Sequence, residues 1–311
     1  MLQVEITDIP PLSAGEVSIA NLHSVLNVVN VLRGELTMVG IALADDEDFF
    51  KPALNICDRI REDLVDPAAS LAHAGAMHAL LSQIDAALAT GLRQFPSRTS
   101  DPSIIESLDN LHCTFRVLET RAREILARSR APEKWEEISV DSLKAEFFSF
   151  LAAVEQNSRG RFGIVYNLAS QGPNDYLVQF NFEAESRRLL NMPAVFKDVM
   201  RDLIANARKY TPSGGMITAG LVETDKHLRF VVKDTGRGIP CPELQSVVHF
   251  GKRGSNVGEV RTLGGGFGLA KAFLVTKQLG GRIWIQSEIG SGTQVTIEIP
   301  RPNAGANRSS V

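Results

Sequence analysis

This sequence is poor in three features, and each scarcity excludes a class of protein. Only three cysteines occur among 311 residues, Cys57, Cys113 and Cys241, and their odd number and wide spacing argue against a disulfide framework or a zinc site, so we interpret them as packing residues. The net charge of −3 provides no general attraction to nucleic acid or acidic membrane. Uninterrupted apolar runs such as FFSFLAAV are far shorter than the roughly 20 residues that span a bilayer, and MLQVEITDIPPL lacks a signal-peptide pattern. We therefore expect a globular cytoplasmic protein with no membrane span.

The pattern of apolar residues divides the chain in two. A hydrophobic content of 44% allows a large core. Residues 16–130 have helical periodicity, interrupted near Asp45, near Pro67 and at 94–103. From about 135 onward, helices at 141–157, 194–210 and 268–279 alternate with strands near 162–167, 177–183, 216–223 and 228–234, and a final hairpin. The sequence predicts an α+β protein with a helical domain at 1–134, a second domain at 135–301 and a flexible tail at 302–311.

A glycine-rich stretch, LGGGFGLAKAFLV, precedes the last predicted helix. Four glycines within five positions, 264–268, allow a ligand to approach the backbone closely. The first amides of a helix lack intrahelical partners and attract anions, so the stretch is a candidate phosphate site. Its spacing fits neither the dinucleotide motif nor the P-loop, and an isolated glycine loop is more often only a turn.

Polar side chains share one stripe of the predicted helix at 194–210. Asp202, Asn206, Lys209 and Tyr210 stand at i, i+4, i+7 and i+8, beside the apolar face of the helix. They could face a ligand in a cleft, or simply be the solvated side of an amphipathic helix.

Two further stretches offer polar groups at strand ends. VVKDTGRGIP ends an apolar strand with Asp234, Gly236 and Gly238; the carboxylate could accept a hydrogen bond from an exocyclic amine while the glycines let the backbone pass close to a flat ring. A simple turn would also explain it. Thr293, at the start of the last strand, could help to hold the same amine.

These four stretches, in this order, resemble the N, G1, G2 and G3 boxes of the ATP-binding domain that sensor histidine kinases share with gyrase-type ATPases, Hsp90 and MutL. The matching segments are DLIANARKYTP, DTGRGI, GGGFGLA and GSGTQVTIEIP, and the ending GGRIWIQSEIGSGTQVTIEIP is similar to the histidine kinase form. Four ordered boxes are much stronger evidence than any one. The resemblance implies that the second domain is an α/β sandwich with a mixed sheet that binds ATP and Mg²⁺.

The resemblance also implies a role for each matching position. Asn206 would coordinate Mg²⁺, Asp234 with Thr293 would bind the adenine amine, and Lys209 with Tyr210 would contact phosphates. Residues 240–263 resemble a mobile lid. The implied cofactor-binding set is Asn206, Lys209, Tyr210, Asp234, Gly236, Gly238, Ile239, Gly264, Gly266, Phe267, Gly268, Leu269 and Thr293.

Position 202 departs from the histidine kinase pattern. Histidine kinases usually carry asparagine there, and the related ATPases carry glutamate as a general base. Asp202 could act as a base or contribute to the magnesium shell, and the sequence leaves this open.

A kinase of this type needs a phosphoacceptor histidine on a dimerising helix. The first predicted helix has an apolar seam that includes Val25, Leu32 and Leu43, and His23 and Asn27 fall on its opposite side. His23 is our candidate acceptor. Asn27 is four residues further on, where the resemblance implies a phosphatase role, although Ser24 replaces the usual acidic residue after the histidine. The competitor, His112, stands near Leu108, Leu111 and Phe115, which predicts a core position.

The sequence therefore suggests a dimeric, cytoplasmic ATP-dependent histidine kinase of a two-component system, with a response regulator as partner. Residues 47–95 exceed the length of a two-helix hairpin and predict an extra helical segment. Two alternatives stay open: a nucleotide-binding scaffold without kinase activity, and a serine kinase of the anti-sigma type.

Overall fold

The structure is a computed structural model that describes residues 2–130, 134–156, 158, 160–184, 188–258 and 265–302. It contains two compact units, one formed by residues 1–10 with 132–311 and the other by residues 11–131. The N-terminal residues thus belong to the C-terminal unit, which corrects the expectation of a single helical domain from residue 1.

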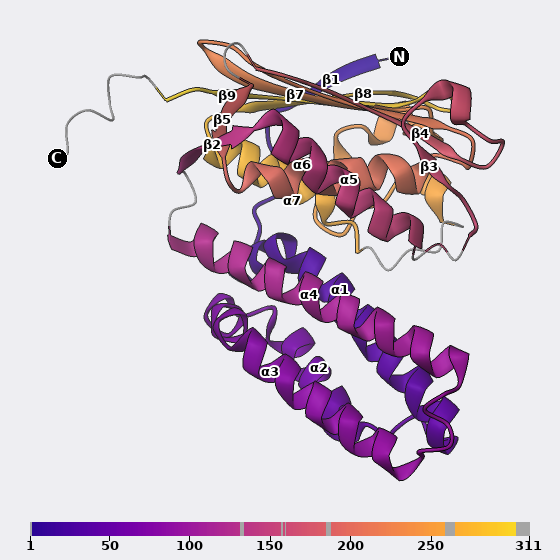
Figure 1. The fold of residues 1–311 in the computed structure, drawn as a ribbon. Coiled ribbons are helices and arrows are strands. Elements are labelled where there is room, and N and C mark those ends of the chain that lie inside the picture. The colour runs from indigo at the N-terminus through magenta and orange to yellow at the C-terminus, as the bar shows by residue number, and fades with distance from the viewer. Residues whose placement is uncertain are drawn as a thin grey trace. The chain divides into compact units, whose positions relative to one another are not determined.

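The unit of residues 11–131 consists of four helices (Figure 1), namely α1 (Ala14–Ala44), α2 (Lys51–Asp63), α3 (Pro67–Gln94) and α4 (Pro102–Arg130). Local signals begin and end them. Ser13 and Glu16 form a capping box at the start of α1, and Asp66 accepts hydrogen bonds from the first amides of α3. The breaks predicted near Asp45, Pro67 and 94–103 are confirmed, and the extra segment at 47–95 contains α2 and α3.

The apolar seam of α1 lies in the core of this helical unit. Val25, Leu32 and Leu43 are buried together with residues of α2, α3 and α4. A stretch of α1, Val25–Ala44, is 20 residues long with a mean hydropathy of 1.3, long and apolar enough to cross a membrane by length and composition. Arg33 and Glu35 interrupt this stretch, so it is not an uninterrupted apolar run, and the inner face of α1 packs against other helices. Cys57 is buried here as predicted, whereas Cys113 and Cys241 are exposed and do not act as packing residues.

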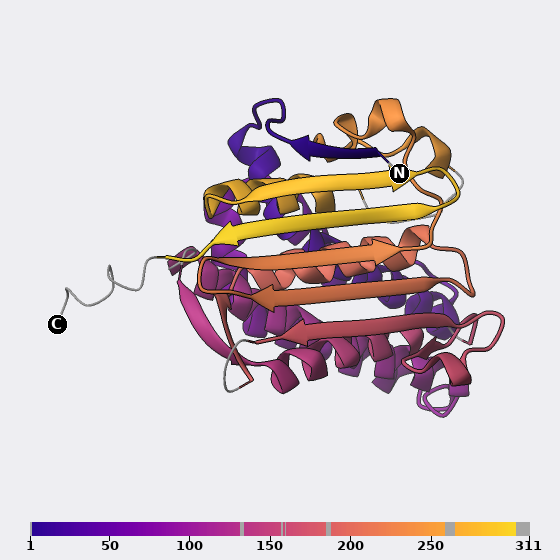
Figure 2. The same cartoon turned by 90° about the horizontal axis from the view of Figure 1, so that it is seen from above.

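The other unit is built on a seven-stranded mixed sheet in the order β1-β8-β9-β7-β6-β4-β3 (Figure 2). Its strands are β1 (Leu2–Ile6), β3 (Ile164–Val165), β4 (Tyr176–Glu183), β6 (Met216–Glu223), β7 (His227–Asp234), β8 (Arg282–Glu288) and β9 (Gly292–Pro300). Strands β3, β4 and β6 are parallel, and the other neighbours are antiparallel. A separate two-stranded sheet pairs β2 (Trp135–Ser139) with β5 (Leu189–Pro193).

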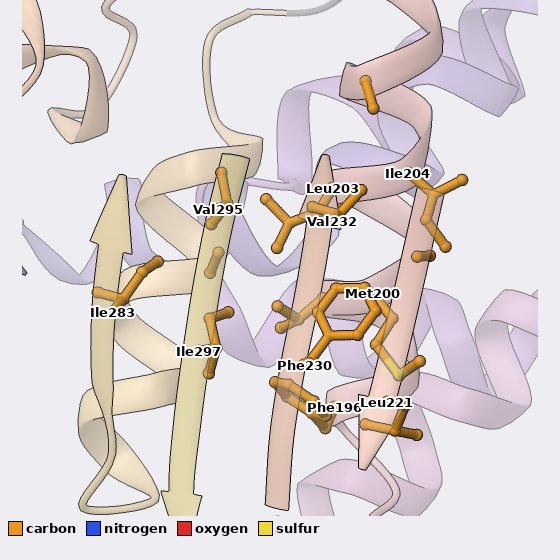
Figure 3. Packing of buried hydrophobic residues seen from close by; sticks show 14 of the residues in the cluster. Phe196, Met200, Leu203, Ile204, Leu221, Phe230, Val232, Ile283, Val295 and Ile297 are labelled. Carbon is orange, nitrogen blue, oxygen red and sulfur yellow. The ribbon is translucent and has the colours of Figure 1, made fainter. Parts of the chain in front are cut away.

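Helices α5 (Val140–Gln156), α6 (Phe196–Tyr210) and α7 (Gly268–Gln278) cover one face of the large sheet (Figure 1). In α6 the apolar residues recur every three or four positions, so Phe196, Met200 and Leu203 point into the core (Figure 3). Phe196 meets Phe230 of β7 edge-on, with 6.0 Å between ring centroids. Truncation of such a buried ring to alanine costs about 3–5 kcal/mol. This packing fixes the position of α6, and of its predicted ligand residues, relative to the sheet.

Three strands were not predicted from the sequence. β1 pairs antiparallel with β8, and Arg282 Nε donates to Glu5 Oε1 at 2.8 Å across this pairing. β2 and β5 pair only with each other. Each of these strands has five residues. Leu2–Ile6 does alternate apolar and polar residues, as a half-buried strand does, whereas Trp135–Ser139 and Leu189–Pro193 do not alternate strictly.

Candidate functional site

Asp234 is the most deeply buried charged residue among the predicted nucleotide ligands. It ends β7 and is 7% exposed. Its Oδ1 accepts hydrogen bonds from the backbone N–H of Gly236 at 2.8 Å and of Thr293 at 3.2 Å. Burial raises the pKa of this carboxyl to about 6, and the two amide hydrogen bonds act in the opposite direction. A carboxylate held in this way is suited to accept a hydrogen bond from a ligand amine.

A network of hydroxyl groups extends the site from Asp234. Ser287 of β8 lies 2.8 Å from Thr293 Oγ1, donates to the carbonyl of Gly292, and accepts from the N–H of Ile239. The structure therefore brings together Asp234, Ile239 and Thr293, as predicted. Ser287 was missed because serine is usually exposed, although its position two residues after the buried Ile285 indicates the inward face of β8.

The glycines of this region are required by close backbone contacts. Gly238 has φ +70°, and a Cβ there would overlap the carbonyl of Glu288. A Cβ on Gly236 would lie 2.6 Å from the carbonyl oxygen of Tyr210. The Tyr210 carbonyl also accepts the N–H of Arg237 at 3.1 Å. The turn after β7 is thereby joined to the end of α6, which places Tyr210 beside the Asp234 region.

Positive charge gathers at the end of α6. Burial lowers the pKa of the Lys209 amine to about 8, and the nearby charges of Arg253 and Arg208 add to the shift. The Lys209 ammonium also lies 5.1 Å from the centre of the Tyr210 ring. Cations that lie close together in a partly buried place are suited to an anionic ligand.

The glycine loop leads directly into α7, which begins at Gly268 as the sequence predicted. Gly266 has φ +79°, and a Cβ there would lie 2.6 Å from the carbonyl oxygen of Lys252. Phe267, the residue before α7, provides no side-chain hydrogen bond to the first amides of the helix. Its ring stacks on Phe250 at 4.6 Å, which connects the loop to the segment that resembles a lid. Gly264 and residues 259–263 lie outside the described part of the chain.

Asn206 lies where α6 meets the first turn of α7. A Cβ on Gly268 would be 2.8 Å from Asn206 Nδ2, so the Asn206 amide lies directly against the start of α7. Leu269, the next residue, packs against the core. The described residues contain no cluster of three or more His, Cys, Asp or Glu that could hold a metal by itself. One amide oxygen beside a phosphate seat fits Mg²⁺, which keeps several waters and takes other ligands from substrate phosphates.

Asp202 is engaged by another side chain. Its Oδ2 accepts a hydrogen bond at 2.8 Å from Lys271 Nζ of α7. The sequence raised Asp202 as a base or part of a magnesium shell, and did not identify Lys271, because a lysine on a predicted helix is usually solvated.

The helical unit carries the candidate phosphoacceptors. His23 lies in α1, and its side chain is outside the described residues; Asn27 is half-buried. His112 was expected in the core, and this is wrong: its side chain is 50% exposed and its Nε2 lies 3.2 Å from Asp85 Oδ1 of α3. The neighbouring apolar residues of α4 face inward, while His112 lies one position beyond them.

The sheet, the three covering helices and the buried carboxylate define a nucleotide-binding α/β sandwich of the type that the four boxes predicted. Residues 193–303 match the family described as histidine kinase-, DNA gyrase B-, and HSP90-like ATPase. These residues therefore form an ATPase domain of that family, preceded in the chain by a helical region.

The curated relatives of the chain are named as sensor kinases. The adaptive-response sensory kinase SasA of Parasynechococcus marenigrum is 36% identical over 35% of this chain and 30% of its own length. The sensor histidine kinase WalK of Bacillus subtilis is 39% identical over 33% of this chain and 17% of its own length. The aerobic respiration control sensor protein ArcB of Escherichia coli is 28% identical over 53% of this chain and 20% of its own length. The chain thus spans less than a third of the length of these relatives.

Proposed function

We propose that this chain is the catalytic part of a cytoplasmic sensor histidine kinase. It binds ATP with Mg²⁺ in the sheet-containing unit and transfers the γ-phosphoryl group to a histidine of the helical unit. A response regulator aspartate then receives the group. The observation that carries this proposal is the buried Asp234 carboxylate, held by Gly236 and Thr293 within an ATPase domain.

The residues divide into an adenine end and a phosphate end. Asp234 accepts a hydrogen bond from the adenine amine, with Thr293 and Ser287 fixing the carboxylate from the side. Lys209 and the first amides of α7 bind the phosphates, since both present positive charge or unsatisfied N–H groups. Asn206 holds Mg²⁺ through its amide oxygen. When bound, the ion neutralises charge on the phosphates.

His23 is the proposed acceptor. One imidazole nitrogen attacks the γ-phosphorus, the bond from that phosphorus to the oxygen of ADP breaks, and the proton of the attacking ring is released. Asn27, one turn further along α1, is proposed to orient water for removal of the phosphoryl group. A one-turn spacing places both side chains on the same side of the helix.

His112 is a second candidate for the acceptor. Its side chain is 50% exposed, and its Nε2 lies 3.2 Å from Asp85 Oδ1. A carboxylate beside an imidazole orients the ring.

The exposed side of α1 supports a homodimer through the helical unit. Val31, Met38 and Ile41 are large apolar residues on the surface at spacings of seven and three. Such a stripe on one helix is suited to pack against a second copy.

Labelling with radioactive ATP tests the acceptor assignment. We expect wild type and His112→Gln to acquire an acid-labile, base-stable label, and His23→Gln to acquire none. If only His112→Gln loses the label, the acceptor is His112 of α4. If both variants keep the label, both assignments are refuted. Wild type that binds ATP but never labels supports a scaffold, and an acid-stable label on a partner protein supports a serine kinase.

A further inference from the structure

A buried ion pair joins α6 to α7 next to the proposed nucleotide site. Lys271 is 1% exposed. Its Nζ lies 2.8 Å from Asp202 Oδ2 and 3.9 Å from Asp198 Oδ2. Asp198 also pairs with Arg201 on α6 at 3.2 Å. Two anions and two cations therefore lie within one group.

Such an arrangement costs free energy, because each buried charge loses its hydration. Only well-placed partners offset that loss. Removing one member leaves a buried charge without its partner, whereas removing both members of a pair does not. The geometry of this group is therefore tightly determined. A hydrophobic contact would have joined the two helices with less geometric precision.

The ion pair lies one helical turn from the residues that contact the ligand. Asp202 precedes Asn206 by four positions on the same face of α6. Lys271 follows Gly268 by three positions on α7. Gly268 and Asn206 are themselves in close contact. Two contacts one turn apart thus set the separation between the Asn206 amide and the start of α7.

We infer that Asp202 and Lys271 are a positioning pair for magnesium-bound nucleotide, and that Asp202 does not serve as a general base. The pair holds Asn206 at the distance from the α7 amides at which both reach the same phosphate tail. Asp202 Oδ2 is taken up by the Lys271 ammonium, instead of being available to receive a proton from a nucleophile. This inference rests on the proposed function.

A double-mutant cycle in the full chain tests the pair. The variants are Asp202→Asn, Lys271→Met and their combination, and the measurement is calorimetric affinity for AMPPNP with Mg²⁺ and with EDTA. Partners that orient a metal ligand are typically worth about 10- to 100-fold in metal affinity. We expect each single variant to lose about that factor in Mg²⁺ and little in EDTA, and the combination to lose no more than either single variant, because both partners are needed for one interaction. The matched control is Lys197→Met, which removes the ion pair of Lys197 with Glu146 of α5 at 3.4 Å on the same helix; it should bind like wild type in both conditions.

Several outcomes overturn the inference. If Lys271→Met binds like wild type in Mg²⁺ while Asp202→Asn loses affinity, Asp202 acts by itself. If affinity falls equally in Mg²⁺ and EDTA, the pair has only a general structural role. If the single variants do not fold, Asp202→Leu with Lys271→Met, which leaves Asp198 with Arg201, replaces them. Weaker binding in Mg²⁺ alone supports the pair, binding and labelling like wild type refute it, and binding without labelling identifies Asp202 as a base. Wild type that binds no nucleotide refutes the proposed function, whereas wild-type binding with unaffected variants refutes only the positioning pair.

Discussion

Replacement of Asp234 by asparagine should make the sheet-containing unit more stable and its nucleotide affinity lower. The carboxyl is buried at the end of β7, and its pKa is raised from 3.8 to about 6 chiefly by burial. Because the folded-state pKa lies above the unfolded value, the ionised carboxylate opposes folding. This cost is fully present above pH 6, decreases as the pH falls through 6, and is absent below about pH 4. A shift of this size corresponds to about 3 kcal/mol in the free energy of unfolding.

Asparagine keeps the interactions that the fold requires. Its amide oxygen can accept the N–H groups of Gly236 and Thr293, which donate to Oδ1 of Asp234. The neutral amide removes the cost of the buried charge. We therefore expect the free energy of unfolding to rise by up to about 3 kcal/mol at pH 8, or roughly 5–10 °C in the melting midpoint of the unit. At pH 4 the two proteins should melt together.

Binding should change in the opposite direction. An amide cannot replace a charged acceptor for the adenine amine, and its own NH₂ group faces another donor, so we expect about 10- to 100-fold weaker binding of ATP. Scanning calorimetry at pH 4, 6 and 8 measures stability, and titration calorimetry measures binding. Asp225→Asn, at an exposed position in the turn before β7, is the control and should show neither effect. A variant that is no more stable than wild type at pH 8 would refute the reasoning about burial, and unchanged ATP affinity would refute the role of Asp234 in adenine recognition.

Three further predictions address the glycine turn, the phosphate end and the helical unit. Gly238→Ala should lower the free energy of unfolding by about 2 kcal/mol or more in thermal melts, because φ is +70° and a Cβ has no space there. Gly290→Ala, at φ +75° in open space, should lose only about 1 kcal/mol. Equal losses would contradict the close contact at Gly238. Burial holds the pKa of Lys209 at about 8, below its ordinary 10.5, so the amine loses its charge as the pH rises through 8. ATP binding at pH 9 should take up a proton, detected by calorimetry in two buffers, and Lys209→Met should abolish both the uptake and the fall in affinity between pH 7 and 9. Met38→Glu places a charge on a position of α1 whose side chain is 60% exposed, and it should convert the dimer to a monomer in light scattering. Leu71→Glu on α3 is the control and should leave the dimer intact. If both variants are dimeric, α1 is not the interface.

Much of the ATPase domain could be predicted because its signals are local. Positive φ at Gly266 and the close approach at Gly238 demand glycine at those positions whatever surrounds them, so the boxes are visible in the sequence. The helix α6 shows its apolar face through spacing alone. The breaks between the helices of the first half follow from caps and prolines, which act on adjacent residues.

Other features depend on segments that are distant in sequence. Glu5 meets Arg282 across the β1–β8 pairing, and no local period in Leu2–Ile6 indicates that partner. Because His112 comes directly after apolar residues of α4, the sequence pattern suggested a core position. The way in which α4 packs on α3 instead places His112 at the surface beside Asp85.

The sequence by itself determined the order of the elements, the glycine positions and the residue types available to a nucleotide, because each of these is set by backbone sterics or helical spacing within a few residues. Tertiary structure alone decided that Ser287 joins Thr293 and that Lys271 engages Asp202. Burial and ion pairing depend on which surfaces meet, and that is settled only when the helices pack on the sheet.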